Sequence, residues 1–140
     1  MNFRVFSSIL ALTFAFAAPT VSAAPRSEGS TIPRGKWGGE HVTLEVSASG
    51  AVIQFDCAHG AIPAPLALDS NGRFQLSGDF VAEHGGPIRV GEVEKHQAVR
   101  YSGRVRGRTM TLSVELGGDQ EGVGPFTLEL GSDGRIVRCR

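Results

Sequence analysis

Apolar and polar side chains alternate with a period of two along most of this chain, and that period restricts the fold more than any other feature. Residues 42–46 alternate in this way, and after a Ser49-Gly50 turn the alternation resumes over residues 52–57. Successive side chains of a strand point to opposite faces, so a period of two predicts half-buried β-strands, and no stretch shows the 3.6-residue period of an amphipathic helix.

The same alternation predicts further strands over residues 74–80, 99–105, 110–116, 126–130 and 136–139. Between them, residues 58–68 and 83–95 are expected to be loops. The 19 glycines lie in short clusters between the runs, as tight turns require. Seven or eight short strands predict an all-β fold: a single antiparallel up-and-down β-barrel of about eight strands, with a β-sandwich as the alternative.

The first 23 residues have the layout of a cleaved export signal. Arg4 supplies the positive start, an apolar stretch follows, and Val21-Ser22-Ala23 offers a small-residue cleavage site. We therefore expect a signal peptide at 1–23, a flexible leader at 24–33 and a barrel domain at 34–140. The protein is expected to be periplasmic or secreted, without a permanent membrane anchor.

The two cysteines, Cys57 and Cys139, both remain after signal removal. In an oxidising compartment an even number favours pairing, and two cysteines allow one disulfide only. A bond that closes a loop of about 80 residues stabilises by roughly 4 kcal/mol in the chain-entropy model. It would also bring the second strand and the last strand together, which favours the barrel.

Composition excludes some classes of partner. The whole chain carries 14 Lys and Arg against 14 Asp and Glu, so removal of Arg4 leaves 13 against 14. A nearly neutral chain has no global electrostatic basis for binding nucleic acid or an anionic membrane. No motif predicts a cofactor, a metal or a catalytic nucleophile, and we expect a monomer that is not an enzyme.

The entry to the first strand resembles the lipocalin or calycin-like barrels. The residues that carry the resemblance are Gly35-Lys36-Trp37 and an arginine near the end of the chain, Arg138 or Arg135. In those barrels the tryptophan closes one end and the arginine packs against it. The resemblance therefore implies an antiparallel meander barrel with Trp37 as its plug.

Longer stretches are similar to two groups of exported bacterial proteins. Residues 37–41, 55–60 and 101–105 resemble small exported bacterial proteins of unassigned function, a resemblance that implies no activity. Phe55-Asp56-Cys57 and the late Cys139 resemble the periplasmic C-type lysozyme inhibitors. That second resemblance implies an inhibitory Ser102-Gly103 loop, although Tyr101 here precedes the Ser-Gly pair instead of following it.

A candidate binding rim lies at the end of the first hairpin. The register we predict pairs Leu44 with Phe55, which puts Asp56 diagonal to His41 and within reach of its side chain. Its candidate residues are Trp37, Glu40, His41, Asp56 and His59. Imidazole and carboxylate groups here could hold a divalent metal, but the spacing matches no metal motif, and we expect instead a surface pair that staples the hairpin.

A second candidate is a stripe of outward-facing arginines: Arg100, Arg104, Arg106 and Arg108. Such a stripe could bind an anionic partner, or it could protect a sheet edge from pairing.

We therefore expect an exported non-catalytic binding module of unknown ligand. The alternatives are a periplasmic inhibitor of an enzyme such as lysozyme, or a carrier of a small apolar ligand inside the barrel. In the carrier the lining would be aromatic and sulfur side chains: Phe55, Phe74, Phe80, Tyr101, Met110 and Phe126.

Overall fold

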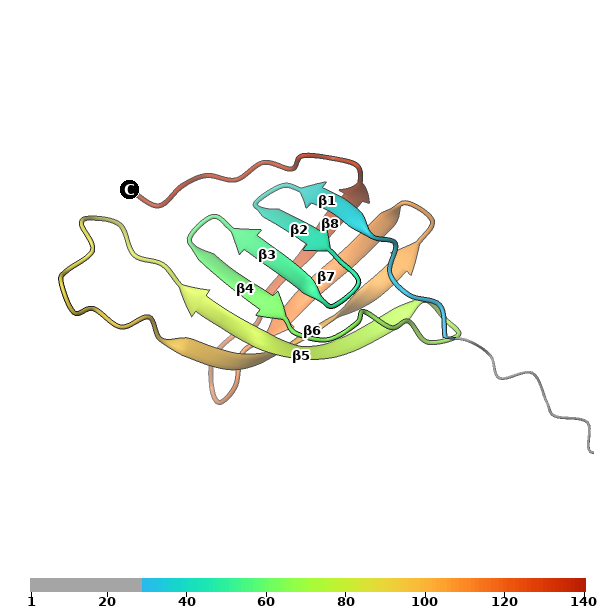
Figure 1. Cartoon of the computed structure of the whole chain (residues 1–140), viewed down its shortest axis with the longest axis horizontal. Helices are drawn as coiled ribbons and strands as arrows, with labels where there is room; N and C mark the ends of the chain where they lie inside the picture. Colours follow the sequence, from blue (N-terminus) through green and yellow to red (C-terminus); the bar gives the residue numbers. More distant parts are fainter. Residues whose placement is uncertain (1–28) are drawn as a thin grey trace, which may run out of the picture.

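The computed structural model describes residues 29–140, which form a closed antiparallel β-barrel (Figure 1). Its eight strands follow the order of the chain around the barrel. They are β1 (Gly35–Gly39), β2 (Val42–Val46), β3 (Ala51–Phe55), β4 (Ala58–Ile62), β5 (Arg73–Ala82), β6 (His96–Arg106), β7 (Thr109–Glu115) and β8 (Val123–Leu130).

Pairing of the first strand with the last closes the barrel. Trp37 lies opposite Leu130, and Gly39 lies opposite Leu128, so β8 returns beside β1. Every other strand pairs with its sequence neighbours, as an up-and-down meander requires. The predicted barrel is confirmed, and the sandwich alternative is excluded by the β1–β8 pairing.

Inward side chains fill the barrel. Trp37, Tyr101, Met110 and Leu128 have no accessible surface. The Tyr101 ring lies over two glycines on neighbouring strands, and its hydroxyl donates a 2.6 Å hydrogen bond to the Asp79 carbonyl. Phe55 packs against other inward rings, with its centroid 5.6 Å from that of Phe80 and 5.5 Å from that of Phe126.

The first hairpin has the predicted inward faces but not the predicted register. Leu44 lies opposite Ile53, two residues from the expected partner Phe55. The reason is the turn: the Ser47 amide donates to the Gly50 carbonyl at 2.8 Å, which ends the hairpin at the pair Val46 and Ala51. A shift of two residues keeps every side chain on its face, so the alternation alone does not detect it.

Two other expectations about strands are wrong. Residues 58–62, expected to begin a loop, form β4, because the turn at Asp56-Cys57 reverses the chain at once. Residues 136–139, expected to form the last strand, lie outside the eight strands in a C-terminal strap, residues 131–140. The strap runs along the outside of the barrel toward the β5–β6 loop (Figure 1).

The strap is held at several points. The predicted disulfide Cys57–Cys139 is confirmed, with 5.2 Å between the two Cα atoms. It joins the β3–β4 turn to the strap, and not one strand to another. Nearer β1, the Gly131 amide donates to the Lys36 carbonyl at 2.7 Å, and the Arg135 amide donates to the Gly39 carbonyl at 2.9 Å.

The predicted signal peptide at 1–23 lies outside the described residues, as does the first part of the expected leader. The end of that leader packs against the rest of the chain: Ile32 is 2% exposed, and its amide donates to the Leu66 carbonyl at 2.9 Å. Contacts with the barrel therefore begin before residue 34. Within residues 29–140 there is no helix long and apolar enough to cross a membrane.

Candidate functional site

One end of the barrel carries the connections β1–β2, β3–β4, β5–β6 and β7–β8, and we call it the loop rim. Antiparallel strands of a meander turn alternately at the two ends, so these four connections must share one end. The β5–β6 connection, residues 83–95, is the long loop at the left of Figure 1. It projects beyond the other turns.

The expected contact between His41 and Asp56 is present at this rim. His41 Nδ1 lies 2.6 Å from Asp56 Oδ2, and the Val137 amide donates to Asp56 Oδ1 at 2.8 Å. The Val137 N–H, with help from His41, lowers the pKa of Asp56 below its usual value. His41 sits in the β1–β2 turn with φ at 68°. Asp56 thus ties two turns to the strap, which is a structural role.

The other residues of the predicted rim do not join this pair. His59 Nδ1 lies 2.7 Å from Glu83 Oε1, and Glu40 Oε1 lies 3.5 Å from Arg135 Nη1. Trp37 is fully buried and donates to the Pro33 carbonyl at 3.0 Å, so it is a core residue and not a rim residue. Over residues 29–140 no group of three His, Cys, Asp or Glu side chains is placed to hold a metal ion.

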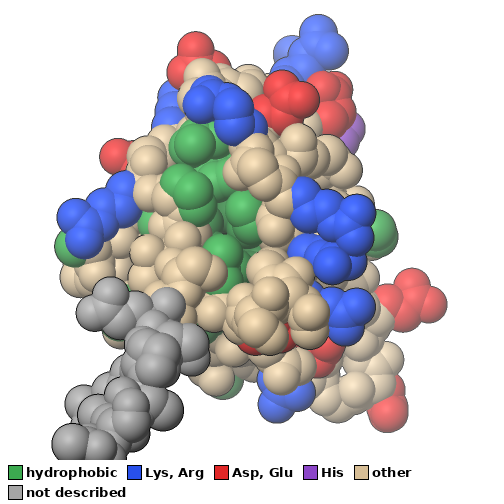
Figure 2. Space-filling view, turned by 90° about the vertical axis from the view of Figure 1, so that its right-hand side faces the viewer, with side chains coloured by type: hydrophobic (Ala, Val, Ile, Leu, Met, Phe, Trp, Pro, Cys, Tyr) green, Lys and Arg blue, Asp and Glu red, His purple; other side chains and the backbone are tan. Residues whose placement is uncertain are grey.

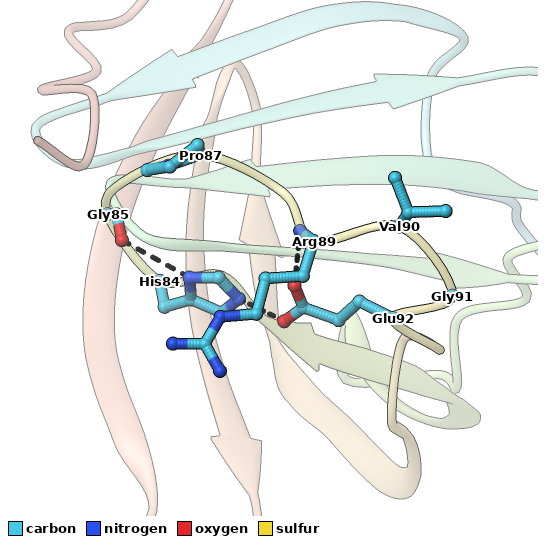
Figure 3. A pocket seen from close by; sticks show the side chains of 7 residues that line it. All are labelled: His84, Gly85, Pro87, Arg89, Val90, Gly91 and Glu92. Atoms are coloured by element: carbon cyan, nitrogen blue, oxygen red, sulfur yellow. Dashed lines mark hydrogen bonds and ion pairs between the residues drawn. The ribbon is translucent and has the colours of Figure 1, made fainter.

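The β5–β6 loop is braced by its own side chains (Figure 3). The carboxylate of Glu92 accepts from the ring of His84 and, at 3.1 Å, from the Arg89 amide. His84 Nδ1 also lies 3.2 Å from the Gly85 carbonyl oxygen. These partners raise the pKa of His84, with Glu92 as the main cause, while the Arg89 N–H and His84 lower the pKa of Glu92.

Three aliphatic side chains of this loop are exposed. Ile88 is 85% exposed, Val93 is 83% exposed, and Val90 is fully exposed. Isolated exposed aliphatics are common on protein surfaces, but three within six residues of a projecting loop are not. Elsewhere in the described chain the large exposed aliphatics are Val52 and Val137, on different elements.

A hollow of about 1000 Å³ lies between this loop and the ends of β5 and β6. Phe80, Val81 and Ala82 line it from the barrel, and Ile88 and Val93 line it from the loop. Its charged lining is mainly acidic: Glu83, Glu92 and Glu94 against Lys95, with His84 and His96 beside them. A smaller hollow of about 700 Å³ lies within the loop itself, where Figure 3 shows His84 and Glu92 facing each other.

The predicted ligand lining of the barrel is used for packing. Phe55, Phe74, Phe80, Tyr101 and Met110 are all buried in one hydrophobic cluster, and Phe126 packs against it half-buried. Phe80 also lines the hollow at the loop rim.

The predicted arginine stripe is partly as expected. Arg100, Arg104 and Arg106 lie on β6 with outward parity, and Arg100 comes within 3.9 Å of Glu115. Arg108 lies in the β6–β7 turn, where its Nη2 donates to the Leu130 carbonyl at 2.7 Å. Sequence reasoning did not include Arg73, which lies opposite Arg104 on β5.

The segment that resembles an inhibitory loop is not a loop. Ser102 and Gly103 lie inside β6, opposite Ser113 and Leu112 of β7. Gly103 faces inward, where a Cβ would collide with the ring of Phe74. These two residues are therefore not placed to enter the cleft of an enzyme.

No family model, no curated protein and no solved structure matches this chain.

Sequence reasoning missed the β5–β6 loop as a candidate site. The apolar residues of this segment recur with a period of neither two nor 3.6 residues, and its polar composition predicts only a loop. A signal was nevertheless present, because hairpin loops usually have two to five residues and this one spans 83–95. Long loops in compact domains are commonly binding elements.

Proposed function

We propose that this protein is an exported, non-catalytic module that binds a partner protein through the β5–β6 loop. One observation carries the proposal: Ile88, Val90 and Val93 are exposed together on a loop that projects from the barrel. Burying three aliphatic side chains against a partner supplies several kcal/mol of favourable transfer free energy at about 25 cal/mol per Å². The exported location rests on the signal-like sequence of residues 1–23.

The bracing of the loop supports a binding role. Glu92 holds the two sides of the loop together through His84 and Arg89. At its base the Cys139 sulfur lies 3.8 Å from the Glu83 carbonyl oxygen, and Glu83 also holds His59. A loop that is already held in one conformation loses less entropy on binding, so more of its contact energy appears as affinity.

The lining of the hollow supports a particular chemistry for the partner. Its apolar floor is surrounded by Glu83, Glu92 and Glu94, with Lys95 as the single permanently basic side chain. A segment with an aliphatic or aromatic side chain next to Lys or Arg would match both the floor and the charge.

The packed interior makes the carrier alternative less well supported, because its expected lining residues contact one another.

The inhibitor alternative keeps one supporting observation: a braced, projecting loop has the form needed to enter an enzyme cleft. The test is hydrolysis of peptidoglycan by a C-type lysozyme. Inhibition that disappears in Ile88→Ser/Val90→Ser/Val93→Ser would make lysozyme the partner.

A photo-crosslinking experiment tests the binding role directly. A benzophenone amino acid is placed at residue 90 or, as the control, at residue 52, where Val52 is 60% exposed on β3. We expect one discrete protein adduct from position 90 in the producing cells and none from position 52. The same adducts from both positions, or no adduct from position 90, would contradict the proposal.

A further inference from the structure

The outer face of β5, β6 and the start of β7 is entirely polar over its central rows, and we call it the polar face. Strand register places its side chains in rows across three strands. Its members are Arg73, Gln75, Ser77, Arg100, Ser102, Arg104, Arg106, Thr109, Thr111 and Ser113. All ten carry hydrogen-bonding groups, and none is aliphatic or aromatic; two carboxylates border the face, Glu115 opposite Arg100 and Glu129 opposite Thr109.

Three arginines gather at one end of the polar face. Arg73 lies directly opposite Arg104, and Arg106 is two residues further along the same strand, about 7 Å away at the rise of a β-strand. Like charges directly opposite each other destabilise a sheet. Because this arginine pair lowers the stability of the free protein, its presence favours a role in binding an anion.

These three guanidinium groups have no carboxylate within ion-pair distance among residues 29–140. Lys36, Arg100 and Arg135, in contrast, each have one. The carboxylate nearest in the chain, Asp69, accepts from the amides of Asn71 and Arg73 within its own turn, and the nearby charges of Arg73 and Arg104 help these amides to lower the pKa of Asp69, so its charge offsets part of theirs. Arg104 uses Nε for the Asn71 carbonyl at 3.2 Å, which orients the guanidinium while its two Nη atoms stay available.

We propose that the polar face binds an anionic polysaccharide, with Arg73, Arg104 and Arg106 holding its sulfate or carboxylate groups. Guanidinium groups bind such anions through paired hydrogen bonds. The hydroxyl of Thr109, opposite Arg106, is placed to bond a sugar hydroxyl. The hydroxyl of Thr111, opposite Arg104, donates to the Arg104 carbonyl at 3.5 Å and keeps its lone pairs to accept from the sugar. A membrane surface fits less well, since stable membrane binding needs apolar side chains to insert and the polar face has none.

The arginine end of this face lies away from the loop rim. Figure 2 looks at the barrel from the end opposite the β5–β6 loop, and Lys and Arg side chains gather along its edges there. A polysaccharide on these arginines leaves the loop accessible, so the module could attach to an anionic matrix while its loop holds a protein. The polar face is independent of the proposed function, and either proposal can fail alone.

The probe is dextran sulfate, with neutral dextran of the same length as its control. We compare the wild type with Arg73→Gln/Arg104→Gln/Arg106→Gln and with a control of equal charge change, Arg89→Gln/Arg138→Gln/Arg140→Gln. We expect saturable binding of dextran sulfate alone, weakened at least tenfold by the first triple substitution and less than twofold by the control. A circular dichroism spectrum and melting curve for each variant exclude unfolding as the cause.

Three results would overturn the proposal. Equal weakening by both triple variants would mean that binding follows net charge and not this face. Binding of vesicles of phosphatidylglycerol and phosphatidylcholine without binding of dextran sulfate would assign the arginines to a membrane. No binding of dextran sulfate by the folded wild type would leave the face without a polysaccharide role.

Discussion

Single residues decide how the inside of this barrel is filled. Gly60 on β4 and Gly78 on β5 both face the ring of Tyr101, and a Cβ on Gly60 would collide with the Tyr101 hydroxyl and the Asp79 carbonyl. Burial raises the pKa of the Tyr101 phenol, which therefore stays protonated and donates to Asp79. The alternation of apolar residues predicts which side chains point inward, but not which glycines make room for them.

Replacing Gly60 should therefore destabilise the fold. We expect Gly60→Ala to lower the free energy of unfolding in urea by about 2–3 kcal/mol, because the backbone of β5 must move to admit the methyl group. Gly117→Ala is the control, since a Cβ there meets no atom within 4 Å. Equal stabilities of the two variants would show that Gly60 is not in tight contact with Tyr101.

His84 gives the β5–β6 loop a dependence on pH. Its partner Glu92 raises the pKa of His84 above the ordinary 6.5, so the ion pair is complete from pH 6.5 down to the lowered pKa of Glu92 and weakens as the pH rises through the raised pKa of His84. NMR titration should find that Glu92→Gln lowers the pKa of His84, and loop resonances should broaden at high pH in the wild type. An unchanged His84 pKa in Glu92→Gln would contradict the bracing of the loop.

At the scale of elements, the C-terminal strap is the part that the sequence predicts least well. Ile136 to Cys139 has the alternation of a strand, yet the barrel closes through β8 and β1, so no edge remains for it to extend. Three contacts hold the strap against the barrel instead. They are an isolated parallel bridge between Arg135 and Glu40, the hydrogen bond from the Val137 amide to the Asp56 carboxylate, and the disulfide. Such contacts depend on where the β1–β2 and β3–β4 turns end, which the period of two does not specify.

The strap should contribute measurably to stability. We expect Cys57→Ser/Cys139→Ser to lose about 2–4 kcal/mol of unfolding free energy, since the bond restricts the unfolded chain. Dithiothreitol should destabilise the wild type by a similar amount and leave the double variant unchanged. A wild type whose stability is unchanged by full reduction of Cys57–Cys139 would show that the disulfide adds nothing to the stability of the barrel.

For the whole molecule, alternation and glycine turns together predicted the architecture, whereas the cysteines pair as expected but join a turn to the strap and not two strands. Each strand buries one face, and a closed meander lets every such face meet one core without leaving an edge. The binding loop that we propose could not be predicted in the same way. His41 and Asp56 meet as expected but serve the strap, while the exposed aliphatics of the β5–β6 loop follow no periodic pattern.

We propose that the β5–β6 loop is the binding element of the molecule. The most direct measurement uses the partner that cross-linking identifies, purified without a cross-link. This partner is titrated in a calorimeter with the wild type, with Ile88→Ser/Val90→Ser/Val93→Ser and with the control Val52→Ser/Val137→Ser. We expect the loop substitutions to weaken binding by tenfold or more, while the control changes the Kd by less than twofold. A loop variant that is folded and binds as tightly as the wild type would show that the β5–β6 loop is not the binding element.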